Sequence, residues 1–375
     1  MRTFGVEEEL LLVDARTGVP LALAVDALNA VGEQNDDSPQ ISSEINQEML
    51  ETQSRPQTSA AALFADVVAA RSSADALVVP MGARAVALAM SPMRFRPHAT
   101  DDLRYNAMME RYGATASGTL VCGLHVHVGI ESREEGVAVL DRIRNWLPVL
   151  LALSANSPFA NGTDTGYASF RFTAWHQWQS AGPTDVFGSV EAYDAFEEIL
   201  VNTGVILDAG MLYLDARLSH KQPTIEIRVS DVCLDARDTV TLAVLVRALV
   251  ETAVEEWRAG VEPVTVPSAA LRLAGWQAAL TGVNGRLPHP VHWRETQAAD
   301  AVATLLDHVR PALAANGDEE EACEGVRRII AGGGGAGRQR EAFARRGRLR
   351  DVVAEAVTVT HATSGAVTGD GLFVA

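Results

Sequence analysis

The chain has 375 residues, 47% hydrophobic and 21% charged, a composition typical of folded globular proteins. Its formal net charge of −17 at pH 7 disfavours nucleic acid and anionic membrane surfaces as partners, because both are bound through Lys and Arg. Only three cysteines are present, far apart, and no apolar run approaches 18 residues. We therefore expect a cytoplasmic protein with no disulfide framework and no membrane span.

In chain order, the first 235 residues predict strands alternating with helices. The expected strands are 3–13, 77–90, 119–130, 211–218 and 223–230, and the expected helices are 58–75, 101–112, 136–153 and 190–203. The later part predicts helices at 237–258, 268–281, 297–315, 319–331 and 337–357. This order indicates an α+β fold in one domain, 1–360, with a mixed part (1–235), a mainly helical part (236–360) and a loose C-terminal tail (361–375).

Three of the expected strands alternate aliphatic residues with residues suited to chemistry. Side chains two apart on a strand share a face. Each strand thus presents one such pair: Glu7 and Glu9, His125 and His127, and Glu226 and Arg228. A solvated face of an antiparallel sheet explains any one strand. All three together favour a site, because solvated faces are usually filled with Lys, Thr, Ser and Gln.

Glu8 is the exception in the run "FGVEEEL", because it shares the apolar face with Val6 and Leu10. A carboxylate is costly in an apolar layer. We expect Glu8 at a sheet edge or in an ion pair.

Several carboxylates on one face repel each other unless they bind protons or cations, and hard divalent cations prefer oxygen ligands. Mg²⁺ is the natural cation, and the imidazoles keep Mn²⁺ or Zn²⁺ open. The segment "SEINQEMLE" offers further ligands in Glu44, Glu48 and Glu51. They share a face if the segment is helical, whereas in a strand Glu44 and Glu51 point oppositely, and an exposed helix face is equally consistent with the pattern.

Residues 153–185 form a long connection rich in Asn, Gly, Pro, Thr and aromatic residues, which is typical of a binding loop. Arg171 lies in it with no acidic neighbour in sequence, which suits an anion ligand better than an ion pair. A plain surface arginine is the alternative.

In this order, the segments "FGVEEEL", "GLHVHVGI", "LSANSPFANGTDTGYASFR" and "TIEIRVSD" resemble the YbdK-type carboxylate-amine ligases of the glutamate–cysteine ligase type 2 family. The stretches "GWQAALTGVNG" and "GAGRQR" are weaker matches. The resemblance implies a glutamine synthetase-like fold, in which a curved antiparallel sheet forms a funnel with metal ions on its inner face and helices outside. It also implies an ATP-dependent reaction: a carboxylate, typically that of glutamate, is phosphorylated, and an amine, typically that of cysteine, attacks the acyl phosphate.

Carried over by position, the resemblance assigns roles to the candidate residues. Glu7, His125 and Glu226 would hold one Mg²⁺, and Glu9, Glu51 and Glu44 another. Arg171 and Arg228 would contact the phosphates or the acyl phosphate, and His127 would lie behind the ligands or face the substrate.

The sequence departs from the family pattern at two places. Ser91 stands where many relatives have His, with Arg94 and Arg96 nearby, and "ALTG" replaces an Arg- and Tyr-containing element. Both changes bear on substrate identity rather than on the metal ligands.

Two other functions use the same residues: a metal-dependent amide hydrolase, and a binding protein for metal or a small molecule. ADP release distinguishes the ligase from both. Small amino acids or amines are the expected substrates, and an exposed sheet edge is compatible with a homodimer.

Overall fold

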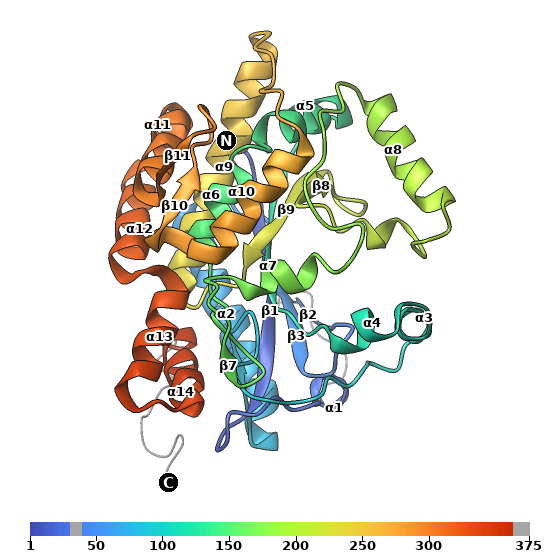
Figure 1. The fold of residues 1–375 in the computed structure, drawn as a ribbon, viewed down its shortest axis with the longest axis vertical. Coiled ribbons are helices and arrows are strands. Elements are labelled where there is room, and N and C mark those ends of the chain that lie inside the picture. The colour runs from blue at the N-terminus through green and yellow to red at the C-terminus, as the bar shows by residue number, and fades with distance from the viewer. Residues whose placement is uncertain (31–39, 363–375) are drawn as a thin grey trace.

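The computed structural model describes residues 1–30 and 40–362 (Figure 1). In this part of the chain, the main sheet has the order β2–β3–β1–β5–β9–β8, β4 also pairs with β1, and every pairing is antiparallel. Its strands are β1 (Phe4–Asp14), β2 (Gln40–Ser43), β3 (Met49–Gln53), β4 (Ala83–Val86), β5 (Gly123–Gly129), β8 (Ala216–Leu218) and β9 (Thr224–Asp231). Two short hairpins lie outside it, β6 (Phe159–Ala160) with β7 (Thr163–Asp164) and β10 (Arg286–Pro288) with β11 (Glu295–Gln297).

The helices of the mixed part are α1 (Ala24–Asn29), α2 (Ala60–Val78), α3 (Leu103–Tyr112), α4 (Ala114–Gly118), α5 (Arg133–Ile143), α6 (Leu147–Ser154), α7 (Phe170–Trp175) and α8 (Val190–Asn202). Those of the helical part are α9 (Ala236–Arg258), α10 (Ser268–Thr281), α11 (Ala298–Asn316), α12 (Glu319–Gly332), α13 (Gly334–Arg346) and α14 (Leu349–Thr360). In Figure 1, α11 to α14 lie on one side of the strands, and α3, α4 and α8 on the other. No helix of the described residues has the length and apolar character needed to cross a membrane.

The aliphatic face of the sheet forms the main core. Val6, Leu124, Val126 and Ile227 are almost fully buried in one cluster with residues of α5, α6 and α9. These residues alternate with the polar ones along their strands, so the opposite face carries the candidate site. The predicted α+β fold with an antiparallel sheet and a helical C-terminal part is confirmed.

Most predicted elements are confirmed to within a few residues. Those that hold are strands 3–13 and 223–230 and helices 58–75, 101–112, 190–203, 237–258, 268–281, 297–315 and 319–331.

Other boundaries were wrong. The strand predicted at 77–90 is only β4, because α2 continues through the apolar run to Val78. The helix predicted at 136–153 is two helices, the second with proline in its first turn, and that at 337–357 breaks at Gly347, whose φ of 68° ends α13. The strands predicted at 119–130 and 211–218 shorten to β5 and β8.

The C-terminal tail does not begin at residue 361 as predicted. His361 is 1% exposed, and its Nε2 lies 2.8 Å from the carbonyl oxygen of Ala85 in β4. The rest of that prediction, 363–375, lies outside the described residues.

Candidate active site

Strand pairing brings the predicted polar side chains together. Residues directly opposite each other in an antiparallel sheet project to the same face, with Cβ atoms about 5 Å apart. Three opposed pairs join β3, β1, β5 and β9: Glu51 with Glu9, Glu7 with His125, and His127 with Glu226. The pairs form one continuous band across four neighbouring strands.

Glu7 is the centre of this band. Its carboxylate lies 3.2 Å from His125 Nδ1 and 3.5 Å from His127 Nε2. Burial opposes ionisation of Glu7, but the two imidazoles outweigh it and hold its pKa far below the usual range. Burial likewise lowers the pKa of His127, and the neighbouring Glu7 carboxylate reverses this and raises it. Glu7 therefore has the ionised carboxylate that a divalent cation needs as a ligand.

The acidic end of the band lies at β2 and β3. Burial, together with the Glu51 and Glu9 carboxylates, holds the pKa of Glu44 well above its usual range. Burial and the Glu7 carboxylate also raise the pKa of Glu51. Neither a single helix nor a single strand places these residues, because Glu44 follows β2 and Glu51 lies on β3 of the same hairpin. Such crowding favours a bound cation.

The donor atoms fit divalent cations. Three groups each offer three ligand atoms within 4.8 Å of one another: Glu7, His127 and Glu226; Glu7, Glu51 and His125; and Glu9, Glu44 and Glu51. Carboxylate-rich sets with at most one imidazole suit Mg²⁺ or Mn²⁺. His127, which the resemblance placed behind the ligands or facing the substrate, belongs to the first of these groups.

Glu226 is held by two arginines. Arg217 on β8 contacts both carboxylate oxygens, through Nε at 2.8 Å and Nη2 at 3.3 Å, and Arg228 contacts Oε1. Burial opposes ionisation, but the two guanidinium groups hold the pKa of Glu226 far below its usual range. Sequence reasoning missed Arg217, although "LDARL" repeats the alternation of the other strands and places Arg217 directly opposite Glu226.

Arg171 lies beside β5 and β9. It is 3% exposed on α7, its Nη1 is 3.9 Å from Asp231, and its Nε has no hydrogen-bond partner among the described residues. Its guanidinium occupies the space above Gly123, where any Cβ would overlap it. The N–H of Gly123 donates to Glu9 at 2.5 Å. Arg171 therefore has a buried acidic neighbour in space that its sequence neighbourhood did not indicate.

Asp231, which sequence reasoning also missed, organises the loop that carries Arg171. It is fully buried and accepts hydrogen bonds from the N–H of Asn156 and the hydroxyls of Ser157 and Ser169, each at 2.8 Å. Gln339 on α13 donates to the carbonyl and side-chain oxygens of Asn156, at 2.8 and 2.7 Å. The "GAGRQR" motif thus supports the site loop from the helical part.

Glu8 points to the opposite side of the sheet, as its place in the alternation predicts. It forms a buried bidentate ion pair with Arg71 of α2, at 2.7 and 2.8 Å, and accepts from the Thr239 hydroxyl at 2.6 Å. The expectation of an ion pair is confirmed.

Three other residues that the sequence singled out, Glu48, Ser91 and Arg94, lie apart from the band. Glu48 is 1% exposed and binds the N–H and the ring of His98, which anchors the segment before α3. Ser91 is also buried and bonds to the main chain of Met93. Arg94 bonds to the carbonyl oxygen of Asn161. Glu48 therefore has a structural role.

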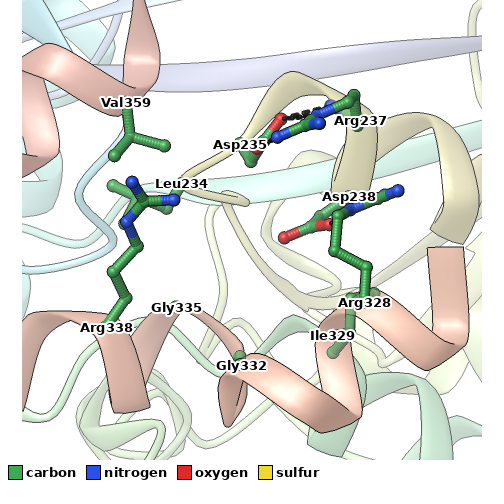
Figure 2. Close-up of a pocket in the computed structure, with 11 residues that line it drawn as sticks. Leu234, Asp235, Arg237, Asp238, Arg328, Ile329, Gly332, Gly335, Arg338 and Val359 are labelled. Atoms are coloured by element: carbon green, nitrogen blue, oxygen red, sulfur yellow. Dashed lines mark hydrogen bonds and ion pairs between the residues drawn. The ribbon is translucent and has the colours of Figure 1, made fainter. Parts of the chain in front are cut away.

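A separate cavity of about 150 Å³ lies where α9 begins and α12 meets α13 (Figure 2). Its arginines are engaged: Arg237 with Asp235, and Arg328 with Asp238. Arg338 binds Glu355. Ion pairing within the chain accounts for these charges, so the cavity is not a second candidate active site.

The fold is that of glutamate–cysteine ligases. The glutamate–cysteine ligase of Francisella tularensis, solved in complex with AMP, superposes with a TM-score of 0.67 at 12% identity, covering 96% of this chain and 88% of that one. A bifunctional glutathione synthetase from Pasteurella multocida has the same TM-score at 17% identity, covering 96% of this chain and 52% of that one. At these identities the likeness concerns the fold alone.

The chain belongs to glutamate-cysteine ligase family 2 (GCS2), whose model matches residues 3–355. A relative from Streptomyces avermitilis is 50% identical over 360 residues, covering 96% of this chain and 99% of its own length. One from Paenarthrobacter aurescens is 48% identical over 366 residues, covering 96% and 95%. Both bear the name "Putative glutamate--cysteine ligase 2-1".

Proposed function

We propose that this protein is an ATP-dependent carboxylate-amine ligase that forms an amide through an acyl phosphate. Glutamate is the proposed carboxylate donor, and cysteine or another amino acid or amine is the proposed acceptor. Family membership and the donor set on the sheet support this proposal. A cytoplasmic location and small-molecule substrates complete it.

Glu7, His125 and Glu226, with His127 beside them, are proposed to hold one divalent cation. Glu9, Glu44 and Glu51 are proposed to hold another. When bound, Mg²⁺ would neutralise phosphate oxygens and help to align the transferring group.

Arg171 and Arg228 are the proposed ligands of the transferring phosphoryl group. Each has a buried Nε without a hydrogen-bond partner in the described chain. An arginine that stabilises charge on this group contributes ~10³-fold or more to the rate of phosphoryl transfer. Arg217 would keep Glu226 oriented while Arg228 contacts the substrate.

One observation carries the proposal: in a glutamate–cysteine ligase fold, three overlapping ligand groups share one face of the sheet with Arg228, whose side chain is 10% exposed, and the buried Arg171 of α7 lies beside them. A hydrolase needs a cation to activate water, but it has no need of arginines suited to a transferring phosphoryl group.

The test is a screen of carboxylate and amine pairs with Mg²⁺ and ATP, in which ADP and product mass are measured together. We expect continued ADP release over many turnovers only when both substrates are present, and a product whose mass is the sum of the two less water. Cleavage of a candidate amide without nucleotide, and no ADP from any pair, would refute the ligase function.

Two variants test the site assignment. Glu9→Gln and Arg228→Ala should abolish turnover and leave the far-UV circular dichroism spectrum unchanged. Glu134→Gln, at an exposed position on α5, is the matched control and should retain wild-type activity. Near wild-type turnover in either site variant would contradict the assignment.

A further inference from the structure

A second polar cluster lies beside the metal-ligand band, where α7, α10 and the start of β8 meet. It consists of His176 at the end of α7, Asp215 just before β8, and Arg272 on α10. The N–H of Asp215 donates to the carbonyl oxygen of Gly182 at 3.0 Å, and its own carbonyl accepts from the N–H of Arg228 at 2.8 Å. The main chain of Asp215 is thus tied to the strand of the proposed phosphoryl ligand.

The Asp215 side chain is 10% exposed, and within the described chain no hydrogen bond reaches its carboxyl group. Burial raises its pKa, and His176, Arg171 and Arg272 act in the opposite direction. A buried carboxylate without hydrogen bonds is costly, so a protein that keeps one usually has a partner for it.

The His176 ring is fixed in orientation. Its Nδ1 lies 2.7 Å from the carbonyl oxygen of Phe172, which can only accept, so Nδ1 carries a proton. The ring also packs on that of Phe172, with centroids 3.9 Å apart. This leaves Nε2 buried, without a hydrogen-bond partner among the described residues, and 3.8 Å from Asp215 Oδ1.

A separation of 3.8 Å is too long for a direct hydrogen bond. A donor placed about 2.8 Å from both atoms would satisfy both, and an ammonium group has three N–H donors and the required positive charge. Gly182 borders the gap: a Cβ there would lie 3.5 Å from His176 Nε2 and 3.9 Å from Arg272 Nη1. His176 Nε2 and Arg272 Nη1 therefore both lie beside Gly182.

Arg272 provides the complementary charge. It is exposed, and the described part of the chain gives it no hydrogen bond or ion pair. Gly275, three residues later on the same helix face, packs against the Phe172 ring, so Arg272 is directed toward α7. A guanidinium with free donors is suited to bind a carboxylate.

We propose that Asp215 and His176 bind the ammonium group of the acceptor and that Arg272 binds its carboxylate. The acceptor is then a zwitterionic amino acid rather than a simple amine. This inference rests on the proposed ligase function and adds the subsite that selects the acceptor.

Calorimetric titration tests the subsite with two probes that differ only in the carboxylate, L-cysteine and cysteamine. Mg²⁺, glutamate and a non-hydrolysable ATP analogue are present to fill the donor side. Asp215→Asn should weaken binding of both probes about 10- to 100-fold. Arg272→Ala should weaken L-cysteine about tenfold and leave cysteamine within about twofold, and Arg272→Lys should restore part of the loss.

Arg286→Ala, at an exposed arginine of β10, is the control and should bind both probes like wild type. Equal affinity of wild type for the two probes, no affinity for either, or wild-type binding by Asp215→Asn would each overturn the subsite. In turnover assays, Asp215→Asn should raise the KM for the acceptor and leave the KM for ATP unchanged. Absence of any turnover in wild type refutes the ligase function instead, while the titration still decides the subsite.

Discussion

Loss of the ion pair between Glu8 and Arg71 should lower the free energy of unfolding strongly. Both side chains are at most 2% exposed, and Arg71 also donates to the carbonyl oxygens of Cys233 and Leu234, at 2.7 and 3.0 Å. Arg71→Met removes every one of these donors at similar volume. Among the described residues, the Glu8 carboxylate then keeps only the Thr239 hydroxyl as a partner.

Removing one member of a buried ion pair typically costs about 3–5 kcal/mol, because the other charge is left buried without compensation. We expect Arg71→Met to destabilise the protein by about this amount. Glu8→Gln should cost a similar amount, because it leaves the Arg71 guanidinium as the unpaired buried charge. The double variant buries no unpaired charge, so its loss should be smaller than the sum of the two single losses by about 2 kcal/mol or more.

Urea unfolding followed by far-UV circular dichroism measures these differences. Arg327→Met is the matched control, because both side chains of its ion pair with Glu324 are more than half exposed and the pair should contribute about 1 kcal/mol or less. The reasoning fails if Arg71→Met costs no more than the control, or if the single losses simply add in the double variant.

Three further predictions concern the site and the separate cavity. Gly123→Ala should lower kcat at least about tenfold without changing the unfolding midpoint, because the added methyl displaces the Arg171 guanidinium. The control Gly118→Ala, where nothing lies within 4 Å of the added methyl, should have no effect. Equal activity of the two variants would contradict this prediction. Mg²⁺ should raise the melting temperature of wild type, because the proposed carboxylate ligands come together only in the folded state. The rise should be smaller for Glu51→Gln. An equal rise in melting temperature for the two proteins would exclude Glu51 as a ligand. Burial and the neighbouring Asp235 carboxylate raise the pKa of Asp238 to about 6 from 3.8, so ionisation of Asp238 should cost about 3 kcal/mol of folding stability as pH rises from 4 to 7. Asp238→Asn should remove this part of the pH dependence of stability. An unchanged profile of unfolding free energy against pH would refute the prediction.

The sequence predicted which side chains share a face, because alternation along a strand is a local property. It could not predict the register that sets Glu7 opposite His125, because strand pairing joins distant residues and leaves no local pattern. Whether the side chains of Glu44 and Glu51 lie close together was open for the same reason, because it depends on the pairing of β2 with β3 in one hairpin.

Residues without an unusual pattern were missed for a related reason. Asp231 closes a recognisable motif, but nothing in the sequence indicates that it receives three hydrogen bonds from a loop some 60 to 75 residues away. Asp215 was readable in principle, because it alternates with Arg217 in the same manner as the other pairs. Its significance depends on His176, which only the folded chain brings near it.

The hydrogen bonds from Gln339 to Asn156 have a consequence for biosynthesis. A ribosome adds about 5–20 residues per second, so the sheet and its ligands are made many seconds before α13 exists. Until then, Asn156 has no donor for the two oxygens that Gln339 later binds. We expect the loop that carries Arg171 to reach its final geometry only as the last helices dock. A nascent chain would then hold the carboxylates of the site before Arg171, the proposed phosphoryl ligand, is in place.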